Sequence, residues 1–175
     1  MAYYYLISSL PMLRAHDAMP LSYDEFLAQC RGALSDSKYE MVKSLTLASA
    51  EGPLVAEWAK FYGVYAAELA YQRRVRLGQK AEPPYDRDEK LSKLITAAMN
   101  NDNPLQAEEM LLAAQFEKID ELIGTHYFDD AALMGYALKL KLLERKYSFK
   151  PDEGKAQLDR IIANLEQEIT GMEQE

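Results

Sequence analysis

Residues 103–147 contain two helical segments with clear start and stop signals, and these signals constrain the fold more than any other feature of the sequence. Asn103 suits the N-cap of the first helix, and Pro104 suits its first turn, where a missing N–H costs no hydrogen bond. Gly124 is expected to end that helix, because glycine is the usual residue just past a helix end. Asp129 then suits the N-cap of a second helix. The spacing predicts two helices joined by a short aromatic sequence.

The same start and stop signals recur in the rest of the chain. Ser22 and Glu25 have the spacing of a capping box, in which each side chain accepts a hydrogen bond from the other residue's backbone N–H. Gly52 and Pro53 interrupt the chain before its longest apolar segment. Apolar residues recur every three or four positions between these signals. The predicted helices are about 22–34, 36–48, 54–76, 86–98, 103–123, 129–147 and 151–172.

No pair of segments alternates polar and apolar residues with the period of a strand. The segment from Tyr3 to Ser9 is the one β-like stretch, and a lone strand has no partner for its backbone hydrogen bonds. A chain of 175 residues, 49% of them hydrophobic, is large enough to bury one core without metals or disulfides. The sequence therefore predicts an all-α fold, with residues 1–175 forming a single helical domain of about seven helices.

The acidic charge of the chain limits its partners. A formal net charge of -8 disfavours binding to nucleic acid or to an anionic membrane, since both require clustered cations. No uncharged run approaches the roughly 20 residues that span a bilayer, and no Lys or Arg precedes the apolar N-terminal run, as a secretory signal requires. The single cysteine, Cys30, excludes an internal disulfide and lies on an apolar helical face. We therefore expect a cytoplasmic protein without direct membrane insertion.

The sequence lacks the motifs that hold cofactors. It has neither a phosphate-binding P-loop nor a glycine-rich dinucleotide turn. Its two histidines are His16 and His126, too few for a histidine-rich metal site. His16 precedes Asp17, a pair that metal-dependent helical phosphohydrolases use, but those enzymes also need an earlier histidine. We expect no enzyme activity, no cofactor and no metal. The enzyme-class alternative is a helical hydrolase that uses His16 and Asp17.

The longest predicted helix, 54–76, has two faces and a cationic end. One face carries large residues, and the adjoining face carries small residues against which another helix could pack closely. The large residues are Leu54, Trp58, Tyr62, Tyr65 and Leu69, and the small ones are Ala56, Ala59, Gly63, Ala66, Ala67 and Ala70. Arg73, Arg74 and Arg76 lie in the last turn, where cations suit the helix dipole. A docking patch is the alternative interpretation of these arginines.

The last predicted helix has a narrow apolar stripe on a polar background. Its members are Leu158, Ile162, Leu165 and Ile169. Such a stripe packs along a single seam, and it covers too few heptads for a free-standing coiled coil. It therefore requires a partner helix, either from the same chain or from another protein.

Three patches of the sequence resemble a bacterial family of unassigned function that is encoded with the components of a V-type ATPase. They are Y-Y-Y-L-I-S-S-L-P-M-L followed by L-S-Y-D-E-F, the start Asn103-Pro104-Leu105, and His126-Tyr127-Phe128-Asp129 leading to Gly135-Tyr136-Ala137-Leu138-Lys139-Leu140. That family is similar to the socket component of V-type ATPases, an all-helical protein that sits on the membrane rotor ring and receives the central axle. In that socket protein a phenylalanine precedes an apolar helix with a tyrosine, as Phe128 precedes Tyr136 here. The present chain is much shorter than the socket protein.

The resemblance implies a non-catalytic cytoplasmic subunit or accessory protein of a V-type ion-translocating ATPase. It would be peripheral to the inner membrane through the complex, and it would link the central stalk to the membrane rotor ring. The candidate partner-binding residues are Tyr127, Phe128, Arg73, Arg74, Arg76, Leu158, Ile162, Leu165 and Ile169. The alternative is a helical adaptor that binds another protein and is unrelated to the ATPase.

Overall fold

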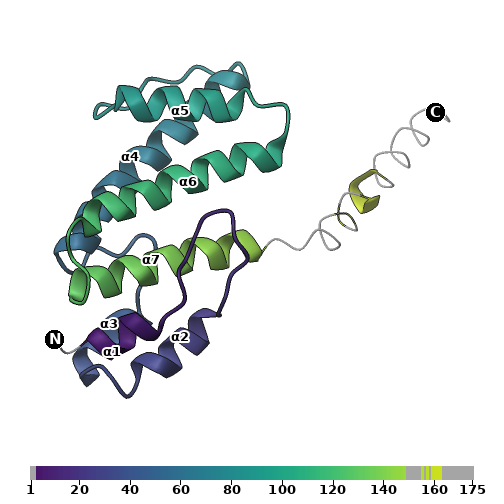
Figure 1. The fold of residues 1–175 in the computed structure, drawn as a ribbon. Coiled ribbons are helices and arrows are strands. Elements are labelled where there is room, and N and C mark those ends of the chain that lie inside the picture. The colour runs from purple at the N-terminus through teal and green to yellow at the C-terminus, as the bar shows by residue number, and fades with distance from the viewer. Residues whose placement is uncertain (1–2, 149–154, 156, 158, 163–175) are drawn as a thin grey trace.

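The computed structural model describes residues 3–148, 155, 157 and 159–162, and this part of the chain is all-helical (Figure 1). The prediction of an all-α fold is therefore confirmed. Residues 3–148 form the helices α1 (Tyr4–Ser9), α2 (Tyr23–Cys30), α3 (Asp36–Lys43), α4 (Pro53–Arg76), α5 (Glu89–Met99), α6 (Pro104–Ile123) and α7 (Asp130–Tyr147). The described residues after 148 are helical as well.

The predicted helix caps are present in the structure. The Ser22 hydroxyl accepts a hydrogen bond from the Glu25 N–H at 3.2 Å, and the Glu25 carboxylate accepts one from the Ser22 N–H at 2.7 Å. Asn103 accepts from the backbone N–H of Leu105 at the start of α6. The Asp129 side chain accepts from the first N–H groups of α7. Each cap satisfies donors that have no partner inside the helix.

The long helix α4 ends at a glycine in the left-handed region of backbone conformation. Gly78 has a φ of 69°. The N–H groups of Gly78 and Gln79 donate to the carbonyl oxygens of Val75 and Arg74, both at 3.0 Å. These two bonds form a Schellman motif, which satisfies the last carbonyl groups of the helix. α4 therefore stops where the sequence predicts.

The β-like segment is helical from Tyr4 to Ser9, in agreement with the predicted all-α fold. In the described part of the chain no strand is available to pair with it. Its backbone groups instead bond within α1, and the hydroxyl of Ser8 donates to the carbonyl of Tyr4 at 2.6 Å. Leu6 is buried in the core and fixes α1 to the rest of the molecule.

Two helices are shorter than predicted, and after the second of them side chains offer the backbone other hydrogen bonds. α2 ends at Cys30, and α3 ends at Lys43. In the loop that follows α3, the Thr46 N–H donates to the Ser49 hydroxyl at 2.9 Å. The indole N–H of Trp58 donates to the Leu47 carbonyl at 3.0 Å. Such bonds compete with continued helix, so the chain forms a loop before α4.

The connection from α4 to α5 extends two residues further than predicted. Asp88, not Asp86, is the N-cap of α5, and its carboxylate accepts from the Leu91 N–H at 2.9 Å. The segment from 77 to 88 therefore crosses from the end of α4 to the start of α5 without helix. Figure 1 shows it running along the outer side of α5.

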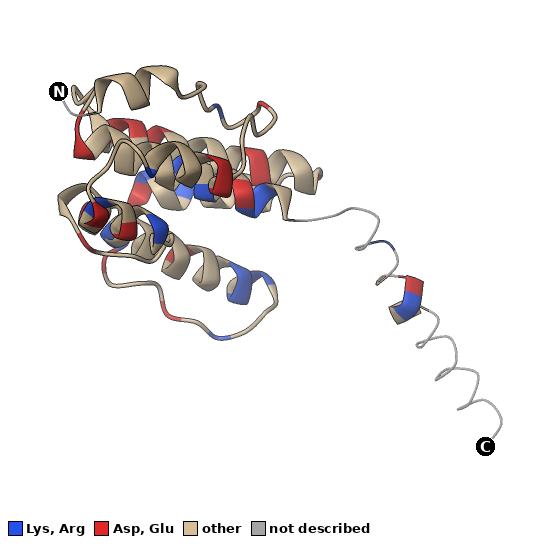
Figure 2. Ribbon diagram, turned by 90° about the horizontal axis from the view of Figure 1, so that it is seen from below, with Lys and Arg blue, Asp and Glu red and all other residues tan. Residues whose placement is uncertain are grey.

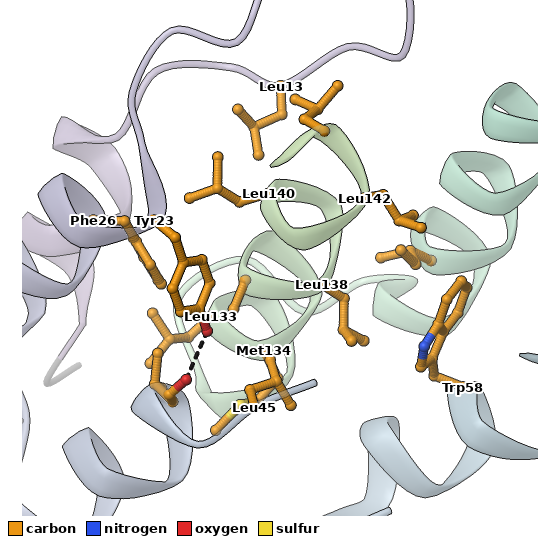
Figure 3. Close-up of a cluster of buried hydrophobic side chains, with 14 of the residues drawn as sticks. Leu13, Tyr23, Phe26, Leu45, Trp58, Leu133, Met134, Leu138, Leu140 and Leu142 are labelled. Carbon is orange, nitrogen blue, oxygen red and sulfur yellow. Dashed lines mark hydrogen bonds between the residues drawn. The ribbon is translucent and has the colours of Figure 1, made fainter. Parts of the chain in front are cut away.

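α7 lies at the centre of the main core and contacts α2, α4 and α6. Its buried residues are Ala132, Leu133, Met134, Gly135, Ala137, Leu138, Leu140, Leu142 and Leu143. Figure 3 shows Leu138 on the side of Trp58, and Leu133 on the side of Phe26. Because α7 buries residues around most of its circumference, helices on both sides of it share one core.

A smaller apolar cluster lies between α4, α5 and α6. Its buried members are Tyr65, Leu69, Leu91, Ile95, Ala98 and Leu111. Phe61 and Tyr62 of α4 pack against both clusters. The predicted large-residue face of α4 is therefore the face that the helix buries, and α4 connects the two clusters.

The small-residue face of α4 does not have the predicted neighbour. Gly63, Ala66, Ala67 and Ala70 are exposed, and a Cβ atom added at Gly63 would meet no atom within 4 Å. Ala56 and Ala59 are half-buried, but within the described residues no helix covers the face from Gly63 to Ala70. Close helix packing occurs instead at Gly135, where an added Cβ would clash with the Ile123 side chain of α6.

Candidate partner-binding site

Two aromatic residues of the α6–α7 join, Tyr127 and Phe128, are exposed, as an interface role requires. The structure brings α1 against them. The Phe128 ring lies 4.6 Å from the Tyr4 ring, and the Tyr4 ring lies 5.6 Å from that of Tyr5, measured between centroids. Tyr5 is 85% exposed and Tyr127 is 68% exposed. We refer to Tyr4, Tyr5, Tyr127 and Phe128 as the aromatic patch.

Polar contacts at the start of α7 hold the patch in place. Asp130 forms an ion pair with Lys38 of α3. Burial and a hydrogen bond to Asp130 raise the pKa of the Tyr3 phenol. These contacts join the N-terminal segment, α3 and α7 directly beside the aromatic rings. The patch therefore rests on three elements that are fixed to one another.

Asp129 and His126 shape the join itself. Asp129 caps α7 and also contacts the His126 ring. Partial burial alone would raise the pKa of the Asp129 carboxyl, but hydrogen bonds from His126 and the Ala132 backbone outweigh it and lower this pKa. His126 thus has a partner that orders the join. This geometry fits a structural residue of the turn.

The arginine end of α4 lies apart from the aromatic patch. Arg73, Arg74 and Arg76 are all exposed, and Arg76 also donates to the Met99 carbonyl, which ties α4 to the end of α5. Figure 1 places this end beside α5, away from α1 and the α6–α7 join. Figure 2 shows the cationic residues there in blue. The structure therefore does not combine the two predicted groups into one surface.

The stripe of the last predicted helix is described only in part. Ile162 is exposed, and its neighbour Ile161 is exposed too. Leu158, Leu165 and Ile169 lie outside the described residues. A partner-binding role for the stripe remains a prediction.

The residues of the hydrolase alternative form no metal site in the described part of the chain. His16 and Asp17 are both exposed, and Asp17 lies 3.9 Å from the Arg14 guanidinium. Among the described residues, no group of three or more potential ligands could hold a metal ion. Cys30 is fully buried, and burial raises its pKa to about 11. Such a thiol stays protonated near neutral pH and is a poor nucleophile.

Sequence reasoning missed one buried polar cluster between α4 and α5. The Glu68 side chain is only 1% exposed, yet it carries a carboxylate. This carboxylate accepts hydrogen bonds from Arg87 at 3.1 Å, from Gln72 at 2.7 Å and from Ser92 at 2.7 Å. The Arg87 guanidinium also lies over the Tyr71 ring, 5.3 Å from its centroid. We refer to Glu68, Gln72, Arg87 and Ser92 as the Glu68 clasp.

The clasp keeps Glu68 ionised despite its burial. Burial alone would raise the pKa of the Glu68 carboxyl, but the bonds from Gln72, Ser92 and Arg87 outweigh burial and lower this pKa. The clasp joins α4, the 77–88 segment and α5. The sequence signal was the four-residue spacing of Glu68 and Gln72 on a largely apolar helix, which places both on one face.

No family model, curated protein or solved structure matches this sequence. Among the described helices, none has the length and apolar character needed to cross a membrane. The exposed aromatic patch is thus the strongest candidate for a functional surface.

Proposed function

We propose that this protein is a non-catalytic subunit or accessory protein of a V-type ion-translocating ATPase. In this proposal it lies in the cytoplasm and binds subunits of the central stalk and the membrane rotor ring through the aromatic patch. The observation that supports it most is the contact between Tyr4 and Phe128. These residues come from two of the sequence patches that resemble the ATPase-associated family, and they lie side by side on the surface.

The composition of the patch suits a protein interface. Buried interface cores are enriched in aromatic residues, and a few such residues carry most of the binding energy. Here the exposed ring of Tyr5 lies against Tyr4, and Tyr127, which precedes Phe128 in the chain, is exposed too. Leu6 and Asp130 anchor the supporting elements without using these rings. The patch can therefore bind a partner without local unfolding.

The helical body suits a mechanical link between two parts of a complex. α4 and α6 are long helices of 24 and 20 residues that pack on one another and on α7. A linking subunit needs a stiff body with a binding surface, and it needs no catalytic group. The present chain is much shorter than the socket protein, so we propose that it adds to the stalk instead of forming the entire socket.

A helical adaptor unrelated to the ATPase is the second candidate. The exposed side chain of Ile162 favours it, since Ile162 belongs to the predicted apolar stripe, and its neighbour Ile161 is exposed too. An adaptor of this kind would bind its partner through residues 158–169, with the aromatic patch left free.

The decisive test is a pull-down of the tagged chain from native membranes solubilised with the ATPase intact. We expect ATPase subunits to be recovered with the wild-type chain and to be lost with the double variant Tyr5→Ser/Tyr127→Ser. Loss of one interface hot spot of about 2 kcal/mol weakens binding about thirtyfold. The matched control is Tyr85→Ser, which removes a fully exposed tyrosine from the 77–88 segment.

Melting temperatures separate lost binding from lost folding. Both side chains of the double variant project into solvent, so its melting temperature should equal that of the wild type. If the folded wild-type chain recovers no ATPase subunit, the proposal fails. Recovery that survives the double variant but is lost with Ile162→Ser would favour the adaptor interface.

A further inference from the structure

A shallow pocket lies where the loop that follows α3 meets α4 and the last turns of α7. Its volume is about 540 Å³, and small-molecule sites in proteins usually measure about 300–1,000 Å³. Leu45, Leu47 and Ala48 of the loop form its apolar part, together with Tyr62 of α4. α7 supplies a polar wall. The pocket therefore combines an apolar surface with charged groups, as sites for small organic molecules do.

The loop side of the pocket is already fixed in the structure. The indole N–H of Trp58 donates to the Leu47 carbonyl at 3.0 Å, and the Tyr62 ring stacks on the Trp58 ring with centroids 5.5 Å apart. The Thr46 N–H donates to the Ser49 hydroxyl at 2.9 Å, and the Ser49 N–H donates to the Thr46 carbonyl at 3.1 Å. A ligand would therefore bind without the cost of ordering this loop.

The polar wall of the pocket carries a net positive charge. Lys141 and Glu144 form an ion pair at 2.9 Å and so offset one another. Arg145 is exposed, and its guanidinium forms no ion pair with a described residue and one hydrogen bond, to the Tyr62 hydroxyl at 3.3 Å. A guanidinium has five N–H donors, so most of them stay available to a ligand. The α7 dipole places roughly half a negative charge at this end of the helix, less than the full charge of Arg145.

We propose that this pocket binds a small organic anion in which an apolar group is attached to a carboxylate. The apolar group would cover Leu45, Leu47 and Ala48, and its burial favours binding. Arg145 would bind the carboxylate, because the planar guanidinium matches a carboxylate with two parallel hydrogen bonds. A cation would be repelled by Arg145, and an anion without an apolar group would leave the apolar surface uncovered.

Trp58 provides a reporter for this pocket in the full chain. It is the only tryptophan of the sequence, and its indole N–H is bonded to a pocket residue. The isotope-labelled protein is titrated with cinnamate and with the neutral amide of the same shape, cinnamamide, and followed by NMR. We expect cinnamate to shift the Trp58 indole signal and the Leu47 and Ala48 amide signals, with a dissociation constant below about 1 mM. Cinnamamide should bind about tenfold more weakly, because it lacks the charge.

Variants of the pocket separate charge from shape. Arg145→Gln should weaken cinnamate binding about tenfold, equivalent to about 1.4 kcal/mol, and should change cinnamamide binding less than about twofold. The matched control is Arg31→Gln, because Arg31 is also exposed and its guanidinium also lies beside a tyrosine, 5.7 Å from the Tyr39 ring centroid. This control should change cinnamate binding less than about twofold. Ala48→Phe adds bulk to the pocket, keeps Arg145 and should weaken both compounds about tenfold.

Three results would overturn the proposal: no saturable shift of the Trp58 indole signal, equal affinity for the two compounds, or shifts confined to the aromatic patch. Unchanged cinnamate affinity in folded Arg145→Gln would also overturn it, and the dispersion of the NMR spectrum shows whether each variant is folded. If Arg145→Gln does not fold, unchanged cinnamate affinity in Ala48→Phe would overturn it instead. The outcome is independent of the ATPase proposal, because none of the pocket residues belongs to the aromatic patch.

Discussion

The α7 core and the α4–α5 region are held together by different interactions. Around α7, large apolar side chains such as Trp58, Leu133 and Leu138 fill a continuous interior. Between α4 and α5 the apolar cluster is smaller, and the buried carboxylate of Glu68 adds directed hydrogen bonds. The α7 core is stabilised by the burial of apolar side chains. The α4–α5 region is stabilised also by the pairing of buried charged groups. The polar contacts of Glu68 thus help to orient α5, which packs outside the main core against a smaller apolar cluster.

The largest effect is expected from removing apolar volume beside α7. Leu138 is fully buried, so Leu138→Ala leaves a cavity and should lower the free energy of unfolding by about 3 kcal/mol. Leu91→Ala in the smaller cluster should cost about 2 kcal/mol, because Leu91 is 8% exposed and fewer buried side chains surround it. Urea denaturation followed by circular dichroism measures both values. Equal costs would contradict the contrast between the two regions.

An intermediate effect is expected from unpairing the Glu68 clasp. Arg87→Met leaves the buried carboxylate without its cation and should cost about 2 kcal/mol, less than for a fully buried pair because the Arg87 side chain is 41% exposed. The double variant Glu68→Leu/Arg87→Met removes both charges. It should be more stable than Arg87→Met alone, since no unpaired charge remains. A double variant less stable than the single one would show that the clasp stabilises beyond its charge balance.

The smallest effect on the free energy of unfolding is expected from lowering the pH. The folded-state pKa of Glu68 lies below its ordinary value of 4.5. The stabilisation of the folded state by the ionised Glu68 carboxylate is therefore fully present above pH 4.5. It is lost as the pH falls through the lowered folded-state pKa. The unfolding free energy should therefore decrease below about pH 4.5, and less steeply in Glu68→Leu/Arg87→Met. Thermal melts between neutral pH and about pH 3 measure both curves, and parallel curves would exclude Glu68 as a contributor.

Much of the helical layout was predictable because local chemistry determines it. Ser22, Asn103 and Asp129 cap their helices with their own side chains, and Gly78 ends α4 through its own backbone freedom. Such signals act within a few residues of the sequence. The helical state of α1 was not predictable in this way, because six residues carry no periodicity that distinguishes helix from strand.

The arrangement of the candidate sites could not be predicted, because it depends on contacts between distant residues. Tyr127 and Phe128 were identified as partner-binding candidates, but the contribution of Tyr4 requires the packing of α1 against the α6–α7 join. The Glu68 clasp likewise requires Arg87 to return from the far side of a non-helical segment. On sequence alone, Glu68 is only one of the few charges on an apolar helix.

The buried thiol of Cys30 gives this protein a natural kinetic reporter. Cys30 is the last residue of α2 and is fully buried in the main core, and it is the only cysteine of the chain. A thiol reagent can reach it only when that part of the interior opens. The rate at which a thiol reagent modifies the unaltered protein should therefore measure how often α2 separates from α7, without any added probe. The same rate, measured while a partner is titrated, would show whether binding at the aromatic patch makes the separation of α2 from α7 less frequent.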